Sequence, residues 1–202
     1  LNGTTVGAVA NRTVVYDEEG NKAEEFAAEL TARGCLKAAE FVNFCDAFNI
    51  PVLTLTNVNG FKATMCSERN IAAAAAKLTY AFGNATVPKV NVITGKAFGN
   101  AYNVMNSKAI GCDMIYAWPK AEIGMMEATL AAKVMYGDTD AATVKEKAAE
   151  YAALQNNVVS AARRGYVDTI IEAQDTRKYV IGAFEMLFTK RDDRPAKKHG
   201  TV

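Results

Sequence analysis

The stretch PKVNVITGKAFGNAYNVM, residues 88–105, decides the fold that we expect, because it joins strand, turn and helix signals within one short segment. Val90, Val92 and Ile93 are β-branched and apolar. Such side chains favour a strand at residues 89–94 that is packed on both faces. The segment therefore predicts a central buried strand followed directly by a helix.

The turn that follows this strand contains two glycines, Gly95 and Gly99. Glycine permits a positive φ or a close approach of another group to the backbone. The pattern becomes helical from Asn100 onward, and the first turn of a helix carries free N–H groups at the positive end of its dipole. Such groups can stabilise an oxyanion. The turn is therefore a candidate site built from backbone atoms.

Further strand and helix signals flank this stretch on both sides. Additional strands are expected at residues 4–10, 52–56, 114–118, 121–125 and 167–171. Helices are expected at residues 34–49, 66–82, 100–110, 127–136, 140–154, 158–164 and 175–189. Short strands that alternate with helices indicate an α/β fold with a parallel sheet and right-handed crossovers. Periodicity alone leaves two arrangements open, a Rossmann-like sheet and a coiled ββα stack.

Other segments are expected to be short or exposed. Residues 12–16 would continue the first strand or pair with it as a hairpin, and residues 17–21 form a turn by composition. Residues 22–30 would form a short surface helix or an irregular excursion. The polar residues 190–202 would form a loose tail.

Helical spacing also predicts which side chains face inward. Expected inward residues of the helices at 34–49 and 175–189 are Ala38, Phe41, Val42, Cys45, Phe48, Tyr179, Ala183, Met186 and Leu187. Ser67 and Thr139 are the expected N-caps of the helices that follow them. The alanine run at residues 72–76 allows close approach of another element, so we expect a partner surface there and a homodimer or larger assembly.

Composition excludes several classes of function. The chain carries 23 basic and 22 acidic residues, for a net charge of +1, which argues against nucleic-acid binding. Its apolar runs are too short to span a bilayer. The single histidine, His199, lies in the polar tail, so neither a Ser-His-Asp triad nor a histidine-rich metal site can form in the core. The four cysteines form no CxxC pair, and we expect them to be reduced and packed in a cytoplasmic protein.

Several ordered stretches resemble one family. AFNIP, ATVPKV, AWPKAEI and RPAKKHG begin at Ala47, Ala85, Ala117 and Arg194. Together with the segments around them, they resemble the C-terminal half of the carboxyltransferase subunit of biotin-dependent acyl-CoA carboxylases, such as propionyl-CoA carboxylase β, and of the related sodium-pump decarboxylase α subunits. The resemblance implies a crotonase-like ββα spiral. It also implies that residues 1–202 form the second of two such domains in a longer subunit.

The resemblance further implies an activity and its partners. The expected reaction transfers a carboxyl group between carboxybiotin and a short-chain acyl-CoA. Biotin would arrive on a carrier protein, and an N-terminal carboxyltransferase domain would bind most of the acyl-CoA. The active site would form between domains of different subunits in a dimer or a trimer of dimers. The location would be cytoplasmic, or peripheral to the membrane within a decarboxylase complex.

The resemblance places the biotin-side oxyanion hole in the glycine turn. The backbone N–H groups of Asn100 and Ala101 match the donors to the biotin carbonyl, and Gly99 matches the first glycine of the family's turn. The resemblance assigns substrate-binding positions to Phe98, Asn103, Asn59, Gly60 and Phe61. No metal ligand is expected.

Two departures from the family pattern keep other functions open. Asn100 stands where the family has glycine, and residues 59–71 replace a loop that is rich in proline and glycine. The chain is therefore also compatible with a non-catalytic relative that keeps only the assembly interface. A crotonase-type CoA hydratase or isomerase is a further alternative, although we find no obvious glutamate pair near the turn.

Overall fold

The computed structural model describes residues 1–137 and 139–193, and its centre is a parallel sheet. Five of the strands that it describes follow the order β1-β5-β7-β8-β10, and β9 pairs with the distal part of β7. These strands are β1 (Gly7–Ala10), β5 (Val52–Val58), β7 (Lys89–Phe98), β8 (Met114–Ala117), β9 (Glu122–Gly124) and β10 (Thr169–Ile170). Every pair among them is parallel. The prediction of an α/β fold with a parallel sheet is confirmed.

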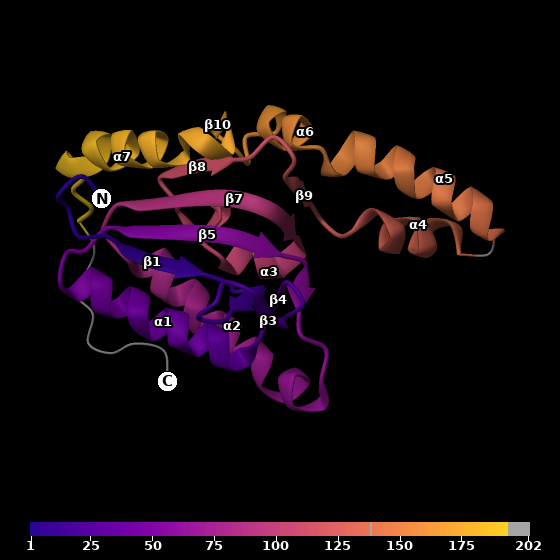
Figure 1. The fold of residues 1–202 in the computed structure, drawn as a ribbon, viewed down its shortest axis with the longest axis horizontal. Helices are drawn as coiled ribbons and strands as arrows, with labels where there is room; N and C mark the ends of the chain where they lie inside the picture. The colour runs from indigo at the N-terminus through magenta and orange to yellow at the C-terminus, as the bar shows by residue number, and fades with distance from the viewer. Residues whose placement is uncertain (138, 194–202) are drawn as a thin grey trace.

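Helices cover both faces of this sheet (Figure 1). The helices are α1 (Ala32–Ala47), α2 (Met65–Asn84), α3 (Gly99–Val104), α4 (Ala128–Tyr136), α5 (Ala141–Tyr151), α6 (Val158–Arg163) and α7 (Thr176–Met186). Single helical turns follow at Lys108–Ile110, Ala152–Asn156, Ala173–Asp175 and Leu187–Thr189. None of the helices in the described residues combines the length and the apolar character that crossing a bilayer requires.

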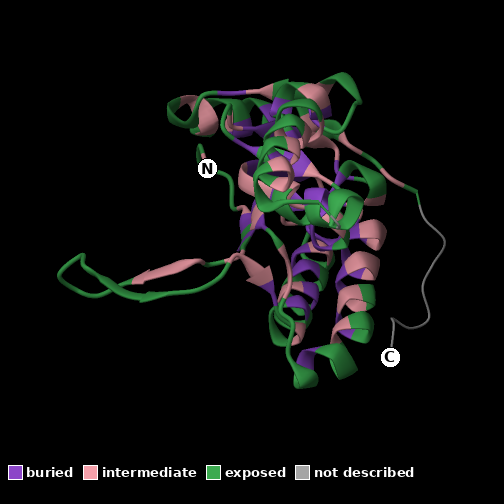
Figure 2. Cartoon of the chain, turned by 90° about the vertical axis from the view of Figure 1, so that its right-hand side faces the viewer, coloured by how far each residue is buried: buried purple, intermediate pink, exposed green. Residues whose placement is uncertain are grey.

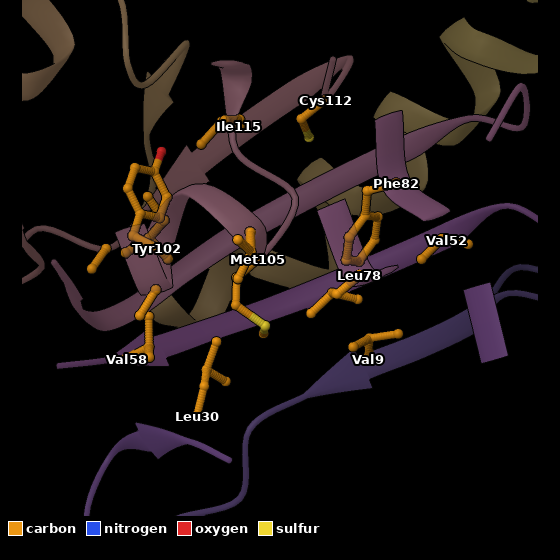
Figure 3. Packing of buried hydrophobic residues seen from close by; sticks show 14 of the residues in the cluster. Val9, Leu30, Val52, Val58, Leu78, Phe82, Tyr102, Met105, Cys112 and Ile115 are labelled. Carbon is orange, nitrogen blue, oxygen red and sulfur yellow. The ribbon is translucent and has the colours of Figure 1, made fainter. Parts of the chain in front are cut away.

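Two apolar clusters hold the layers together. On one face, Leu78 and Phe82 of α2 gather with Val9 and Val52 of the sheet (Figure 3). On the other face, side chains of β7, β8 and α7 form a second cluster. Because β7 lies between these clusters, its apolar residues are buried on both sides, as the run at residues 90–93 predicts.

Two appendages extend from this body. Strands β2 (Val14–Tyr16) and β3 (Lys22–Glu25) form an antiparallel ribbon that projects from the body and is mostly exposed (Figure 2). Helices α4 and α5 pack on each other and extend beyond the sheet (Figure 1). The helix expected at residues 127–136 is present as α4 and belongs to this helical arm.

The ribbon corrects two predictions. Residues 12–16 neither continue nor pair with β1, since β2 pairs with β3. Residues 22–30 are not helical, because they contain β3 and the short strand β4 (Glu29–Leu30), which pairs with β6 (Gly60–Phe61). The turn between β2 and β3 lies at residues 17–21, as predicted. Its Asp17 Oδ1 accepts N–H bonds from Glu19 and Asn21 at 3.0 and 2.7 Å, which closes the ribbon without helical structure.

The predicted inward faces of α1 and α7 are confirmed at Val42, Cys45 and Ala183 and wrong at several aromatic and long side chains. Phe48 is 65% exposed, while the buried residues of α1 are Cys35, Ala39, Val42 and Cys45. Small residues face the sheet there because the backbone of Gly7 comes close to Cys45; a Cβ on Gly7 would lie 2.5 Å from its Sγ. In α7 the buried residues are Val180, Ala183 and Phe184. Tyr179 and Met186 are exposed.

Helix boundaries and caps also differ in detail. The N-caps are Thr64 and Asp140 instead of Ser67 and Thr139, and each accepts an N–H bond from the residue three positions on. The helix expected at residues 100–110 ends at Val104. Three cysteines are buried and Cys66 is exposed, with all four thiols free.

The tail predicted at residues 190–202 is described only as far as residue 193. Within that part, Lys190 Nζ lies 2.9 Å from Asp113 Oδ2 and donates to the carbonyl of Val87 at 3.2 Å. The start of the predicted tail is therefore bound to the body of the fold. Residues 194–202, with His199, lie outside the described residues.

Candidate active site

The turn between β7 and α3 depends on glycine at position 99. Gly99 has a φ of +58°, a left-handed conformation that side chains with a Cβ seldom adopt. A Cβ at this position would also lie 3.0 Å from the carbonyl oxygen of Met125. Gly99 therefore meets two separate requirements, a backbone conformation and a close approach between two chain segments.

The first turn of α3 presents backbone N–H groups. Phe98 occupies the N-cap position, and its side chain makes no capping hydrogen bond. The N–H groups of the first helical residues have no carbonyl partner within the helix itself. Asn100 is helical and exposed, so its side chain points outward while its N–H belongs to this uncapped turn. Gly99, not Asn100, takes the positive φ.

Most of the site residues that the resemblance nominates line one hollow. Its volume is about 310 Å³, at the lower end of the range of about 300–1,000 Å³ for small-molecule sites. The nominated residues in its lining are Asn59, Gly60, Phe61, Phe98, Gly99, Asn100 and Ala101. Asn103 does not belong to this lining; it is exposed on α3, where its carbonyl accepts a bond from Ser107 Oγ at 2.8 Å.

The sequence did not predict the residues that line the opposite side of the hollow, its second wall. It runs from the end of β9 into α4 and contributes Met125, Met126, Glu127 and Leu130. The register explains its position, because Phe98 pairs with Gly124. The residues after Gly124 are therefore brought beside Gly99. The strand at 121–125 was predicted, but its pairing with the distal part of β7 could not be read from its own residues.

Asparagine side chains support both walls of the hollow. Asn57 Oδ1 accepts the N–H of Lys96 at 2.9 Å, and a Cβ on Gly95 would lie 2.6 Å from that oxygen. On the other side, Asn156 Nδ2 donates to the carbonyl of Met126 at 3.2 Å. Each asparagine therefore fixes backbone next to the hollow, and neither lines it.

The lining has few titratable groups. Its carboxylate is Glu127, which lies 3.4 Å from Lys96 Nζ at a half-exposed position. No cluster of three side chains suited to binding a metal occurs among the described residues. Tyr102 of α3 points into the core (Figure 3), where burial raises the pKa of its hydroxyl and keeps it neutral. The hollow is therefore a candidate for stabilising negative charge through the backbone N–H groups of the first turn of α3.

A larger cavity lies elsewhere in the molecule. It has a volume of about 750 Å³ and lies between the N-terminal segment and α7. None of the nominated residues lines it. We therefore place the candidate site at the smaller hollow, where independent parts of the chain bring these residues together.

Comparison with known proteins gives a family for the whole chain. A family model described as carboxyl transferase domain matches residues 1–202. The methylmalonyl-CoA carboxyltransferase 12S subunit of Propionibacterium freudenreichii subsp. shermanii is 42% identical over 99% of this chain and 38% of its own length. The methylmalonyl-CoA decarboxylase subunit alpha of Propionigenium modestum is 40% identical over 100% of this chain and 38% of its own length. The chain thus spans just over a third of these relatives.

A solved structure shows the same fold. The transcarboxylase 12S crystal structure with methylmalonyl-coenzyme A and methylmalonic acid bound superposes with a TM-score of 0.82 at 46% identity. The superposition covers 85% of this chain and 34% of that one, which is described as a hexamer assembly. This likeness to a carboxyltransferase confirms the crotonase-like fold class.

Proposed function

Since the chain belongs to the carboxyl transferase domain family, we propose that it is the biotin-side domain of an acyl-CoA carboxyltransferase. It would act as the second of two domains in a longer subunit, as a carboxylase or decarboxylase component. One observation carries the proposal. The family's match extends over the whole chain, and all but one of the residues that the resemblance nominates meet in one hollow beside an uncapped helix start.

The hollow would suit the ureido ring of biotin by its backbone donors and its apolar lining. The N–H groups of Asn100 and Ala101 would donate to the ureido carbonyl oxygen and stabilise the negative charge that develops there. Phe61 and Leu130 offer apolar surface to the ring. Carboxybiotin, brought by a carrier protein, would supply the carboxyl group for transfer.

The acyl-CoA substrate and a further side of the active site would come from a partner. Met125 and Leu130 line the hollow and are 76% and 53% exposed, and exposed apolar residues continue along α4. Large apolar patches of this kind mark interaction surfaces. We assign this side to a first carboxyltransferase domain that binds a short-chain acyl-CoA. Ala72, Ala73 and Ala76 of α2 are also exposed and support a homo-oligomer.

A non-catalytic relative is the second candidate, and the Asn100 side chain favours it. Asn100 is exposed and belongs to the lining of the hollow, so it adds a side chain where the family has glycine. Its backbone N–H remains available. The two functions therefore make opposite predictions for the protein as it stands and for its Asn100→Gly variant.

Carboxyl transfer by the full-length subunit separates the two functions. The subunit would be incubated with its biotin carrier and a short-chain acyl-CoA that carries a labelled carboxyl group. Our proposal expects label on the carrier, with Asn100→Gly at least as active as the parent because both keep the N–H. Absence of label with the parent and with Asn100→Gly, in correctly assembled protein, would support the non-catalytic relative.

A further inference from the structure

Four fully buried polar side chains lie beneath the candidate site. Thr54 and Thr56 belong to β5, Asn91 belongs to β7, and Asn106 follows α3; each is 0% exposed. Burial of a polar side chain costs free energy unless its hydrogen bonds are made. Apolar residues of similar shape would fill these positions without that requirement. The four polar residues therefore call for a reason beyond packing.

Hydrogen bonds join these residues to the end of α3. Asn91 Nδ2 donates to the carbonyls of Met105 and Asn106, at 3.1 and 3.0 Å. Asn91 Oδ1 accepts the hydroxyl of Thr56 at 2.9 Å, which fixes the orientation of the amide. Asn106 Nδ2 donates to Thr54 Oγ1 at 3.1 Å. The two neighbouring strands therefore hold the residues that immediately follow α3.

Asn106 closes the helix in an uncommon conformation. Its φ is +56°, which asparagine tolerates better than most residues. Met105, just before it, is buried in the same apolar cluster as Leu30 and Leu78 (Figure 3). Apolar packing thus keeps this segment on the sheet, while the directional bonds of Asn91 and Asn106 set its orientation. The segment ends α3 at one fixed position.

We propose that Asn91, oriented by Thr56, is a positioning residue for the oxyanion turn at Gly99–Ala101. This inference rests on the proposed function. Helix α3 has six residues and is about 9 Å long, so a displacement of its end is passed on to its start. The donors at Asn100 and Ala101 have no side-chain cap that would hold them independently. The direction of these N–H groups is then set by strands β5 and β7, which hold the end of α3.

The test uses the full-length subunit with Asn91→Ala and Thr56→Val. Thr56→Val removes the hydroxyl that orients Asn91 while keeping the shape, so it serves if Asn91→Ala does not fold. Val42→Ala, in the core of α1, is the control for general loss of stability. We expect Asn91→Ala to lower kcat by about 10²-fold, as misplacement of a catalytic group by about 1 Å does. Its KM for acyl-CoA should stay near that of the parent, because the partner domain binds this substrate.

Hydrogen exchange of the amides at residues 99–104 gives a second, independent readout. Exchange should rise in Asn91→Ala and Thr56→Val and stay unchanged in Val42→Ala. The inference would be overturned if Asn91→Ala and Val42→Ala, compared at equal free energy of unfolding, lost the same factor in kcat. It would also be overturned if hydrogen exchange of the amides at residues 99–104 did not change in Asn91→Ala and Thr56→Val. If the parent subunit transfers no carboxyl group, the proposed function fails, and the exchange comparison alone still decides whether Asn91 positions the turn.

Discussion

The two walls of the hollow are fixed in different ways. The wall formed by β7 and α3 is continuous with the sheet, and Ala97, Phe98 and Ala101 within it are buried. The wall formed by the β9–α4 connection carries exposed Met125 and Leu130 and leads into the projecting arm. The β7–α3 wall is held in place by buried contacts within this chain, whereas the β9–α4 wall presents apolar side chains to water.

This difference separates two tasks. Under the proposed function, charge stabilisation needs donors that do not move when the reaction occurs, and a rigid strand-to-helix turn would provide them. Contact with a second domain needs exposed apolar surface, which α4 would provide. The β7–α3 wall should therefore respond to small changes in backbone geometry, and the β9–α4 wall should tolerate changes of side chain.

Among Gly99→Ala, Gly124→Ala and Glu127→Gln, which test this comparison, Gly99→Ala should have the largest effect. The variant must adopt a positive φ, at a cost of about 1–2 kcal/mol, and must move Met125 away from the new Cβ. Because both changes displace the donors, carboxyl transfer should fall by about 10²-fold. Steady-state turnover of the full-length subunit measures the loss.

Gly165→Ala is the matched control for this prediction. Gly165 also has a positive φ, of +81°, but a Cβ there would meet no atom within 4 Å. Its variant should lose a similar free energy of unfolding and retain its turnover. Equal losses of turnover in the two variants would show that the strained backbone conformation, and not the position of the turn, limits activity.

Gly124→Ala should have an intermediate effect, because it disturbs the support of the second wall. A Cβ at Gly124 would lie 2.4 Å from Asn156 Oδ1, so the Asn156 side chain that holds Met126 must shift. We expect a loss of about 1–3 kcal/mol in unfolding free energy, typical of overpacking, measured by urea denaturation. Gly182→Ala in α7, where a Cβ meets open space, should be neutral or stabilising by up to about 1 kcal/mol.

Glu127→Gln should have the smallest effect. Its ion pair with Lys96 joins side chains that are 39% and 43% exposed, and such pairs contribute about 0–1 kcal/mol. Unfolding free energy and turnover should therefore change little, and any change should shrink as salt is raised. A loss as large as that of Gly99→Ala would contradict the comparison, because Glu127 would then act in the chemistry itself.

Local patterns predicted the rigid wall better than the other wall. The β-branched run at residues 90–93 and the glycine at 99 indicate the strand and the turn, although β7 continues through Gly95 to Phe98, beyond the predicted end at residue 94. The second wall depends on the pairing of β9 with the far end of β7. That contact joins segments more than twenty residues apart, and the spacing of apolar residues within either segment does not predict it.

The inward faces of the helices also show that local sequence patterns do not predict contacts between distant segments. Phe48 has the spacing of an inward face, yet it is 65% exposed, and the helix turns small residues such as Ala39 toward the sheet. The close approach of β1 to α1 decides this orientation, and the spacing of apolar residues does not contain it. The buried amide of Asn91 was equally hidden, since an asparagine within an apolar run gives no indication of the carbonyls that it will bind.

The most direct test of the central claim compares Asn100→Pro with Asn100→Ala in the full-length subunit. Both variants lose the asparagine side chain, but only proline removes the backbone N–H, and proline is tolerated in the first turn of a helix. We predict that kcat for carboxyl transfer is about 10²- to 10³-fold lower with proline than with alanine. Equal turnover of the two variants would contradict the account, because the N–H at position 100 would then not stabilise the reacting oxyanion.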